Sequence, residues 1–352
     1  MPNPILYRRI LAVMACTPII PINALDITNL INELTDAQIQ GIINGRLQQR
    51  VVEITTLGAN TYTKPNDLVF AFVVCIGAGG GGAGGRKGAS GTNRTGGGGG
   101  AGGAMARRWL TNSQISSLTT VTIGTGGTAG LGVTTDTTNG ASGGNGGQSS
   151  FGTLVIATGG LGGSGGIQST TTLGGLSTVI TSQTPAQFPL SSGTTAGGNG
   201  TNTGNPGDGN ATGFSLVLGG NGAGGAGCGT GNTNGQGGNG SRTYDYTGTL
   251  TAIIAGSNAP NTGSNGTNNQ SLQLHFDYVS GIPLNTIGFG TSASGGGSSG
   301  LAGTAGGSAG NSGLYGTGGG GGGSTTNDSN ILSSGNGSVG AQGCCVIFEY
   351  YV

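Results

Sequence analysis

Glycine recurs at almost every third position between Gly295 and Gly322, in the run GGGSSGLAGTAGGSAGNSGLYGTGGGGG. One phase lasts from Gly297 to Gly306, and after a slip of one residue a second phase begins at Gly307. A period of three fits neither an amphipathic helix nor an alternating strand, but it fits a helix with three residues per turn. The absence of proline argues against collagen. Two interpretations remain: a packed array of polyglycine-type helices, or a flexible linker.

Glycine dominates the whole chain, with 85 among 352 residues, against a usual share of about 7%. Inside regular structure, glycine costs roughly 0.5–1 kcal/mol more than alanine in backbone entropy. A folded glycine-rich domain must recover this cost through close backbone packing and hydrogen bonds between segments. Charged residues are only 6% and the net charge is zero, whereas disorder usually combines low hydrophobicity with high net charge. We therefore expect an ordered chain.

The cations cluster in one short stretch. Five of them form a basic island: Arg86, Lys87, Arg94, Arg107 and Arg108. After Arg108 the only cation is Arg242, so most of the chain offers a neutral surface of Gly, Ser, Thr and Asn. A nucleic-acid interface needs a large clustered basic face, so nucleic acid is excluded as a partner. We interpret the island as a solvated loop, and contact with lipopolysaccharide phosphates is left open.

The five cysteines, Cys16, Cys75, Cys228, Cys344 and Cys345, show no CxxC spacing. Three of them, Cys75, Cys344 and Cys345, sit in apolar runs, where a free thiol behaves as a small buried hydrophobe. The pattern favours neither a disulfide framework nor a zinc site, and it predicts folding in a reducing compartment.

The amino-terminal region reads as an ordinary protein segment. Its apolar run Ile10–Ala15 is shorter than the core that an export signal needs, and no stretch of the chain is long and apolar enough to insert into a membrane. Within Asp26–Gln49, apolar residues recur near helical spacing, which predicts short amphipathic helices. Such helices cannot bury their apolar stripe alone, so we expect them to dock onto another chain or onto copies of themselves. The residues of this stripe are Ile27, Leu30, Ile31, Leu34, Ile42 and Ile43.

A unit of a short apolar strand followed by a glycine run recurs along the chain. Its strands are Leu68–Ile76, Val121–Ile123, Leu154–Ile156 and Phe214–Leu218, and Cys344–Tyr351 is expected to be the last strand. Repeats of this kind must stack to bury apolar surface, and flexible linkers need no regular strands between them. The repeat therefore favours an ordered body over a linker.

These observations predict a mainly β fold with glycine-rich polyglycine-II-type helices packed in a layered body, preceded by a short α-helical docking region. We divide the chain into an amino-terminal docking or oligomerisation region (1–56), a proximal glycine-rich β domain (57–180) and a glycine-rich body with variable loops (181–352).

Catalytic chemistry is not indicated. A nucleophilic triad would have to use the single histidine, His275, and the glycine runs end in neither Gly-Lys-Ser nor Gly-Lys-Thr. We expect no enzyme activity, no cofactor and no metal. The candidate binding residues are two aromatic–polar clusters that interrupt the glycine composition, although strand core or edge remains an alternative role for them. They are Arg242, Tyr244, Asp245 and Tyr246 in one cluster, and His275, Asp277 and Tyr278 in the other.

Four sequence elements occur in an order that resembles the glycine-rich domain of tailed-bacteriophage fibre and receptor-binding proteins. They are NTYTKPNDLVFAFVVCIGAGGGGAGG, GGAMARRWLTNSQISSLTTVTIGTGG, GQSSFGTLVIATGGLGG and GAQGCCVIFEYYV. The resemblance covers about residues 58–352, and its middle part matches mainly in composition.

The resemblance implies a virion protein, made in the host cytoplasm, that serves as a tail fibre or tail-tip adhesin. It would bind a host-surface glycan or outer-membrane protein non-covalently. Residues 1–56 lie outside the resemblance, and we expect their apolar stripe to dock the protein to other tail or fibre proteins. It would be a homotrimer, or a monomer that caps a trimeric fibre. Two alternatives stay open: a purely structural virion component, such as a fibre connector or head fibre, and an exported bacterial glycine-rich surface protein.

Overall fold

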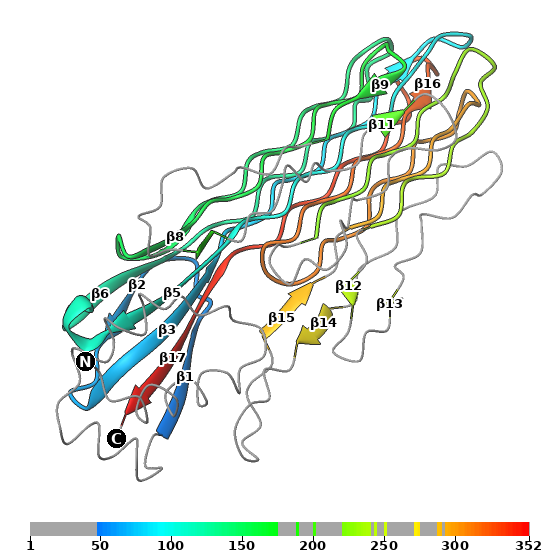
Figure 1. The fold of residues 1–352 in the computed structure, drawn as a ribbon. Coiled ribbons are helices and arrows are strands. Elements are labelled where there is room, and N and C mark those ends of the chain that lie inside the picture. Colours follow the sequence, from blue (N-terminus) through cyan, green and yellow to red (C-terminus); the bar gives the residue numbers. More distant parts are fainter. Residues whose placement is uncertain are drawn as a thin grey trace.

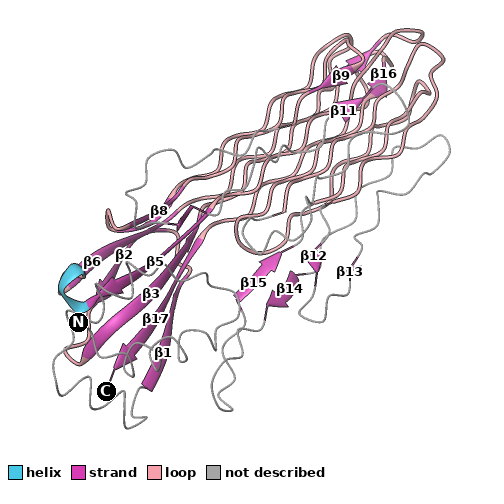
Figure 2. Ribbon diagram, in the orientation of Figure 1, coloured by secondary structure: helices cyan, strands magenta, loops and turns pink. Residues whose placement is uncertain are grey.

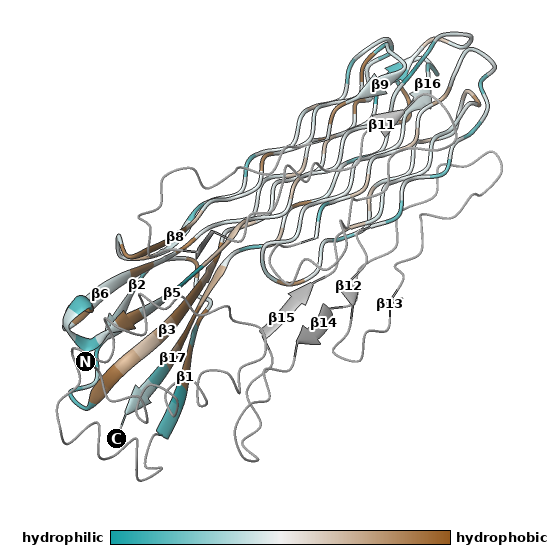
Figure 3. Ribbon diagram, in the orientation of Figure 1, coloured by the Kyte–Doolittle hydropathy of each residue, from teal (hydrophilic) through white to brown (hydrophobic). Residues whose placement is uncertain are grey.

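A computed structural model describes residues 48–174, 220–240 and 293–351, together with the backbone of short strands between them. The described chain is elongated (Figure 1). A β-sandwich lies at one end, near the carboxyl terminus, and a body of long glycine-rich segments extends from it. Apolar residues concentrate in the strands of the sandwich, whereas the body is of intermediate hydropathy (Figure 3).

The sandwich consists of two antiparallel sheets. One has the order β1-β17-β3-β5-β10 and the other the order β2-β6-β7-β8. The strands are β1 (Gln48–Ile54), β2 (Gly58–Thr63), β3 (Leu68–Ile76), β5 (Met105–Thr111), β6 (Leu118–Ile123), β7 (Ser149–Phe151), β8 (Val155–Ala157), β10 (Phe188–Pro189) and β17 (Cys344–Tyr351). The expected strands Leu68–Ile76 and Cys344–Tyr351 are confirmed at both ends, and they pair with each other at the centre of the larger sheet. Phe214–Leu218 lies outside the described residues.

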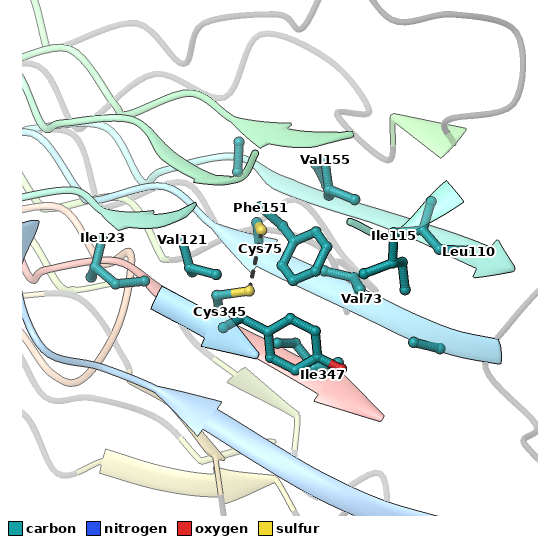
Figure 4. Close-up of a cluster of buried hydrophobic side chains, with 14 of the residues drawn as sticks. Val73, Cys75, Leu110, Ile115, Val121, Ile123, Phe151, Val155, Cys345 and Ile347 are labelled. Carbon is teal, nitrogen blue, oxygen red and sulfur yellow. Dashed lines mark hydrogen bonds between the residues drawn. The ribbon is translucent and has the colours of Figure 1, made fainter. Parts of the chain in front are cut away.

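Side chains from both sheets meet in one apolar core (Figure 4). Val73 and Ile347 enter it from the larger sheet, and Val121 and Phe151 enter it from the smaller one. The opposite face of the larger sheet carries a second cluster with several aromatic rings, among them Phe70 stacked on Tyr350 at 4.7 Å between centroids. Because β3 is buried on both faces, its sequence is continuously apolar instead of alternating.

A buried carboxylate links the two sheets. Glu349 of β17 has no solvent exposure. It accepts a hydrogen bond of 2.7 Å from the Tyr62 hydroxyl of β2 and pairs with Arg50 of β1. Burial is the main cause that raises the pKa of Tyr62, and the neighbouring carboxylate adds to it. The charge of Glu349 is thus compensated by one cation and one donor, as a buried ion requires.

The glycine-rich body is built from segments that leave the sandwich, turn at the far end and return. Residues 77–85 continue from β3, and residues 96–104 lead back into β5. Residues 124–132 and 140–148 connect β6 to β7 in the same way, and residues 334–343 lead into β17. Figure 2 shows these segments as extended loops that run side by side.

The hydrogen bonds of the body run between segments. The amides of Gly80 and Ala83 donate to residues 101 and 98, those of Gly81 and Gly84 donate to residues 144 and 141, and those of Gly82 and Gly85 donate to residues 338 and 335. Three successive amides thus donate to three different neighbouring segments, and every third amide donates to the same segment. This three-residue hydrogen-bonding pattern explains why glycine recurs with a period of three in the sequence.

Glycine is required where segments approach one another. A Cβ at Gly82 would lie 1.9 Å from the carbonyl oxygen of Gly320, a distance that only a backbone shift could relieve. The outward positions of a peripheral segment carry side chains, as at Thr125, Thr128 and Leu131, which are exposed at intervals of three.

The expected fold class needs correction. The described residues contain strands and one short 3-10 turn, η1 (Asn112–Gln114), but no α-helix. The glycine-rich segments expected as polyglycine-II-type helices form no helix either, but extended loops whose amides bond sideways to neighbouring segments. The α-helical amino-terminal region is also corrected, since Gln48–Ile54 is a strand that pairs with β17 along its whole length. Residues 1–47 lie outside the described part.

The opening glycine stretch belongs to this body, and the linker interpretation is wrong. Gly296 donates to Gly321, and Gly307 donates to Gly297 after the chain has turned back. The remaining short strands pair two by two. They are β4 (Lys87–Gly88) with β16 (Thr325–Thr326), β9 (Thr171–Thr172) with β11 (Gly200–Thr201), β12 (Thr243–Tyr244) with β13 (Leu250–Thr251), and β14 (Ser271–Leu274) with β15 (Ile287–Gly290). Within the described ranges, no helix has the length and apolarity to cross a membrane.

Candidate functional site

The end of the body that lies far from the sandwich gathers the turns of the glycine-rich segments (Figure 1). We call these turns the tip loops, and they comprise residues 86–95, 133–139, 167–173, 228–234, 299–305 and 325–333. They contact one another directly: Lys87 pairs with Thr325, Arg94 with Cys228, and Thr95 donates to Ile167. The loops therefore form one connected surface.

Lys87 organises the tip loops from inside. Its side chain is fully buried, and its ammonium group donates to the carbonyl oxygens of Thr134 at 2.8 Å and Leu332 at 2.7 Å. It also pairs with Asp328 and, at 3.1 Å, with Asp136. Since a buried ammonium is tolerated only when it is paired and hydrogen-bonded, this arrangement fastens two loops to the start of a third.

The two carboxylates shape the loops that carry them. Asp328 accepts from the backbone amides of Ile331 and Leu332, at 3.0 Å each. The hydrogen bond from Lys87 is the main cause that lowers the pKa of the Asp328 carboxyl, although burial opposes it. Asp136 accepts from the amides of Ser329 and Asn330 on the opposite loop. The loops 133–139 and 325–333 are thus interlocked by charge-assisted hydrogen bonds.

Two buried guanidinium groups lie in the same region, and neither forms an ion pair with a carboxylate of the described residues. Arg94 is fully buried and donates to the carbonyl oxygen of Ala89 and to Asn232 Oδ1. Arg86 donates to Asn139 and Gln168. Burial is the main cause that lowers the pKa of Arg86, and the charge of Arg94 adds to it. Both Nε atoms lack hydrogen-bond partners.

The backbone of the tip loops is strained. Four described non-glycine residues have a positive φ, between 53° and 68°, and all of them lie in the tip loops: Thr137, Asn232, Ser329 and Asn330. This region of conformational space is sparsely populated by residues with a side chain. Such strain persists only where the surrounding structure over-determines it, and it clusters at functional sites. The buried cations beneath the loops supply that restraint.

The outer surface of the tip loops combines apolar and neutral polar groups. Ile331 is 73% exposed and Leu301 is 48% exposed. The same set of loops exposes hydroxyl and amide side chains, among them Thr137, Ser329 and Asn330. This surface suits non-covalent contact with neutral groups. Over the described residues, no group of three or more His, Cys, Asp and Glu could hold a metal ion.

The basic island is not the solvated loop that the sequence predicts. Arg86, Lys87, Arg94 and Arg107 are all buried, because the surrounding segments close over them. Arg107 and Arg108 belong to β5 in the sandwich, so the structure separates them from the three cations of the tip loops. Sequence reasoning missed Asp136 and Asp328 as partners of Lys87. Their isolation as charges in a neutral, glycine-rich stretch is the signal that could have found them.

The residues predicted to contact a receptor fall almost entirely outside the described part of the chain. Only the backbone of Tyr244 is described, in β12, where it pairs with Leu250. Arg242, Asp245, Tyr246, His275, Asp277 and Tyr278 lie outside the described residues, as do the predicted docking residues Ile27, Leu30, Ile31, Leu34, Ile42 and Ile43. These assignments stay predictions, as do the domain boundaries at residues 56 and 180.

Comparison with known proteins found one family model that spans both the sandwich and the glycine-rich body. The model of a protein family described as a glycine-rich domain matches residues 55–351, which is most of the chain. The chain therefore belongs to this glycine-rich domain family. No curated protein matches the chain.

Proposed function

We propose that this glycine-rich domain protein is a virion adhesin of a tailed bacteriophage, a tail-fibre or tail-tip component that binds a host-surface receptor non-covalently. The proposal rests on the arrangement of the tip loops. A body held together by its backbone presents one connected set of strained loops at the end far from the sandwich. The resemblance of four ordered sequence elements to phage receptor-binding proteins supports the same assignment.

Rigid presentation is what such a binder needs. Loops fixed in their bound conformation lose little conformational entropy on binding, and the buried Lys87 with its two carboxylates provides that fixation. The interior of the body holds few side chains, mostly small ones such as those of Ala83 and Ala101, so the length of the body serves as a spacer between the sandwich and the tip loops. Exposed apolar groups flanked by hydroxyls and amides match the mixed character of glycans and of outer-membrane protein loops.

The test is adsorption of the purified, labelled full chain to cells of the bacterium in which the phage grows. Ile331→Ser and Leu301→Ser in one variant should lower the amount bound about tenfold, since each removes apolar surface that a receptor would bury. Val339→Ser is the matched control, because Val339 is also exposed (54%) but lies on the side of the body. It should bind like the unchanged protein.

The same assay separates an adhesin from a purely structural virion component, and one binding surface from another. If the purified protein neither binds cells nor blocks adsorption of the virion, the adhesin proposal is wrong and a purely structural role stands. If cell binding survives the tip variant but is lost when Arg242, Tyr244 and Tyr246 are changed to alanine, the receptor contacts lie in that cluster and the tip is not the binding surface.

A further inference from the structure

Two cysteines that are far apart in the sequence face each other in the sandwich. Cys75 of β3 and Cys345 of β17 are direct partners in the register of the two antiparallel strands. Their sulfur atoms lie 3.5 Å apart, and both point into the apolar core between the sheets (Figure 4). The two residues are separated by 270 positions, so no spacing rule could have paired them.

The geometry is close to that of a disulfide. A disulfide needs Cα atoms within about 7 Å and sulfurs at about 2.05 Å. Directly opposed residues of an antiparallel pair meet the first condition, since their Cα atoms are about 4.5–5.5 Å apart. The sulfurs must approach by roughly 1.5 Å to meet the second, which side-chain rotation and a small strand adjustment can supply.

We propose that Cys75 and Cys345 are a dithiol that becomes a cross-strand disulfide when the protein leaves a reducing compartment. The oxidant is a small-molecule disulfide. A thiolate of one cysteine attacks it and releases one thiol, and the second cysteine then attacks the mixed disulfide and releases the other. Two protein thiols lose two hydrogens, and the oxidant is reduced to two thiols.

Burial sets the rate of this reaction. The hydrogen bond with Cys75, together with burial, raises the pKa of Cys345, so little thiolate exists while the sheets are closed. Oxidation therefore proceeds through openings of the sandwich, and the disulfide then opposes further opening. The bond would join the first long strand of the family domain to its last, and thereby close almost the whole glycine-rich body into one loop.

The remaining described cysteines provide controls. Cys344 is the immediate neighbour of Cys345, but it belongs to the cluster on the opposite face of the sheet. Cys228 lies in the glycine-rich body, where its thiol is 3.4 Å from Ser298 Oγ. Neither has a thiol partner among the described residues, so Cys344→Ser should leave the reaction intact.

The experiment incubates the reduced full chain with oxidised glutathione at temperatures that approach its unfolding transition. The expected product is lighter by about 2 Da, yields a peptide that links Cys75 to Cys345, and unfolds at a temperature higher by about 5 °C or more. Cys344→Ser should behave alike. Cys75→Ser, or Cys75→Ala if the serine variant does not fold, should give neither the linked peptide nor the shift.

Two results would overturn the proposal. One is a product in which Cys75 and Cys345 each carry glutathione but no bond joins them, because it shows that both thiols were reached and did not pair. The other is two free thiols after the chain has been cycled through unfolding and refolding with the oxidant, because the core has then been opened without reaction.

Discussion

The sandwich and the glycine-rich body solve the problem of stability in opposite ways. In the sandwich, side chains such as Phe151 and Ile347 fill the space between two sheets and remove apolar surface from water. In the body, segments approach so closely that most positions between them leave no room for a side chain, and only small ones such as Ala83 and Ala101 are buried there. Hydrogen bonds from backbone amides to neighbouring segments stabilise this region instead. Each hydrogen bond contributes little by itself, so the body depends on their number and on close packing.

Because of this difference, the two regions should be destabilised by opposite kinds of substitution. The sandwich should suffer when a large residue becomes small, since a cavity remains. The body should suffer when the smallest residue gains a methyl group, since a neighbouring backbone must move. Outward positions of either region should tolerate both changes.

The largest expected effect is in the sandwich. Phe151 is fully buried, and its ring lies 5.3 Å from that of Tyr62. Phe151→Ala should lower the free energy of unfolding by about 3–5 kcal/mol, measured by denaturant titration. Leu118→Ala is the control, since Leu118 is 63% exposed in the same sheet. An equal loss in both variants would contradict a core that is held by side chains.

A methyl group in the body should be nearly as harmful. Gly82→Ala places a Cβ at 1.9 Å from the carbonyl oxygen of Gly320, and we expect a loss of about 1–3 kcal/mol or more. Gly231→Ala meets no atom closer than 3.6 Å, so it should be neutral. If thermal unfolding shows Gly82→Ala to be as stable as the unchanged protein, the body is not close-packed.

The polar link between the sheets should contribute less. Tyr62→Phe removes the donor to Glu349 while the ring keeps its packing. The carboxylate then stays buried with Arg50 as its partner, at an expected cost of about 1–3 kcal/mol. The double variant with Glu349→Gln should lose less than the sum of the two single variants, because the residues interact directly. Strict additivity would show that the hydrogen bond does not hold the sheets together.

The smallest expected effect is the loss of stability at low pH that the Lys87–Asp328 ion pair of the tip loops causes. Lys87 lowers the pKa of Asp328 below that of the unfolded chain, which is about 3.9. This contribution to stability is therefore present above about pH 4 and is lost as the pH falls through the folded value. The melting temperature should drop between about pH 4 and pH 2 by less in Asp328→Asn than in the unchanged protein. Identical pH profiles would mean that the ion pair adds nothing.

Local sequence predicted the parts of the fold that depend on local chemistry. Leu68–Ile76 and Cys344–Tyr351 are continuous β-branched and aromatic runs, and both are strands with the predicted bounds. The period of three correctly indicated a packed, hydrogen-bonded body, although the segments are extended loops instead of helices. Gln48–Ile54 was missed, because its strand character comes from pairing with residues at the other end of the chain.

The candidate site could not be predicted, because distant residues build it. Lys87 and Asp328 are 241 positions apart, and only the folding of the glycine-rich segments brings them together. The same applies to Cys75 and Cys345. A cation in a glycine-rich stretch reads as solvated until one knows which backbones surround it, and that information lies in the order of the segments and not in the local sequence.

Hydrogen exchange of the native protein tests most directly whether backbone hydrogen bonds hold the body together. The amides of Gly79–Gly85 all donate to other segments and are buried. They should therefore exchange as slowly as those of β3, through an opening that approaches global unfolding. The amides of Ala89 and Ser90, which lie in an exposed turn, provide the fast reference. Fast exchange throughout Gly79–Gly85, with β3 still protected, would contradict a body built on its backbone.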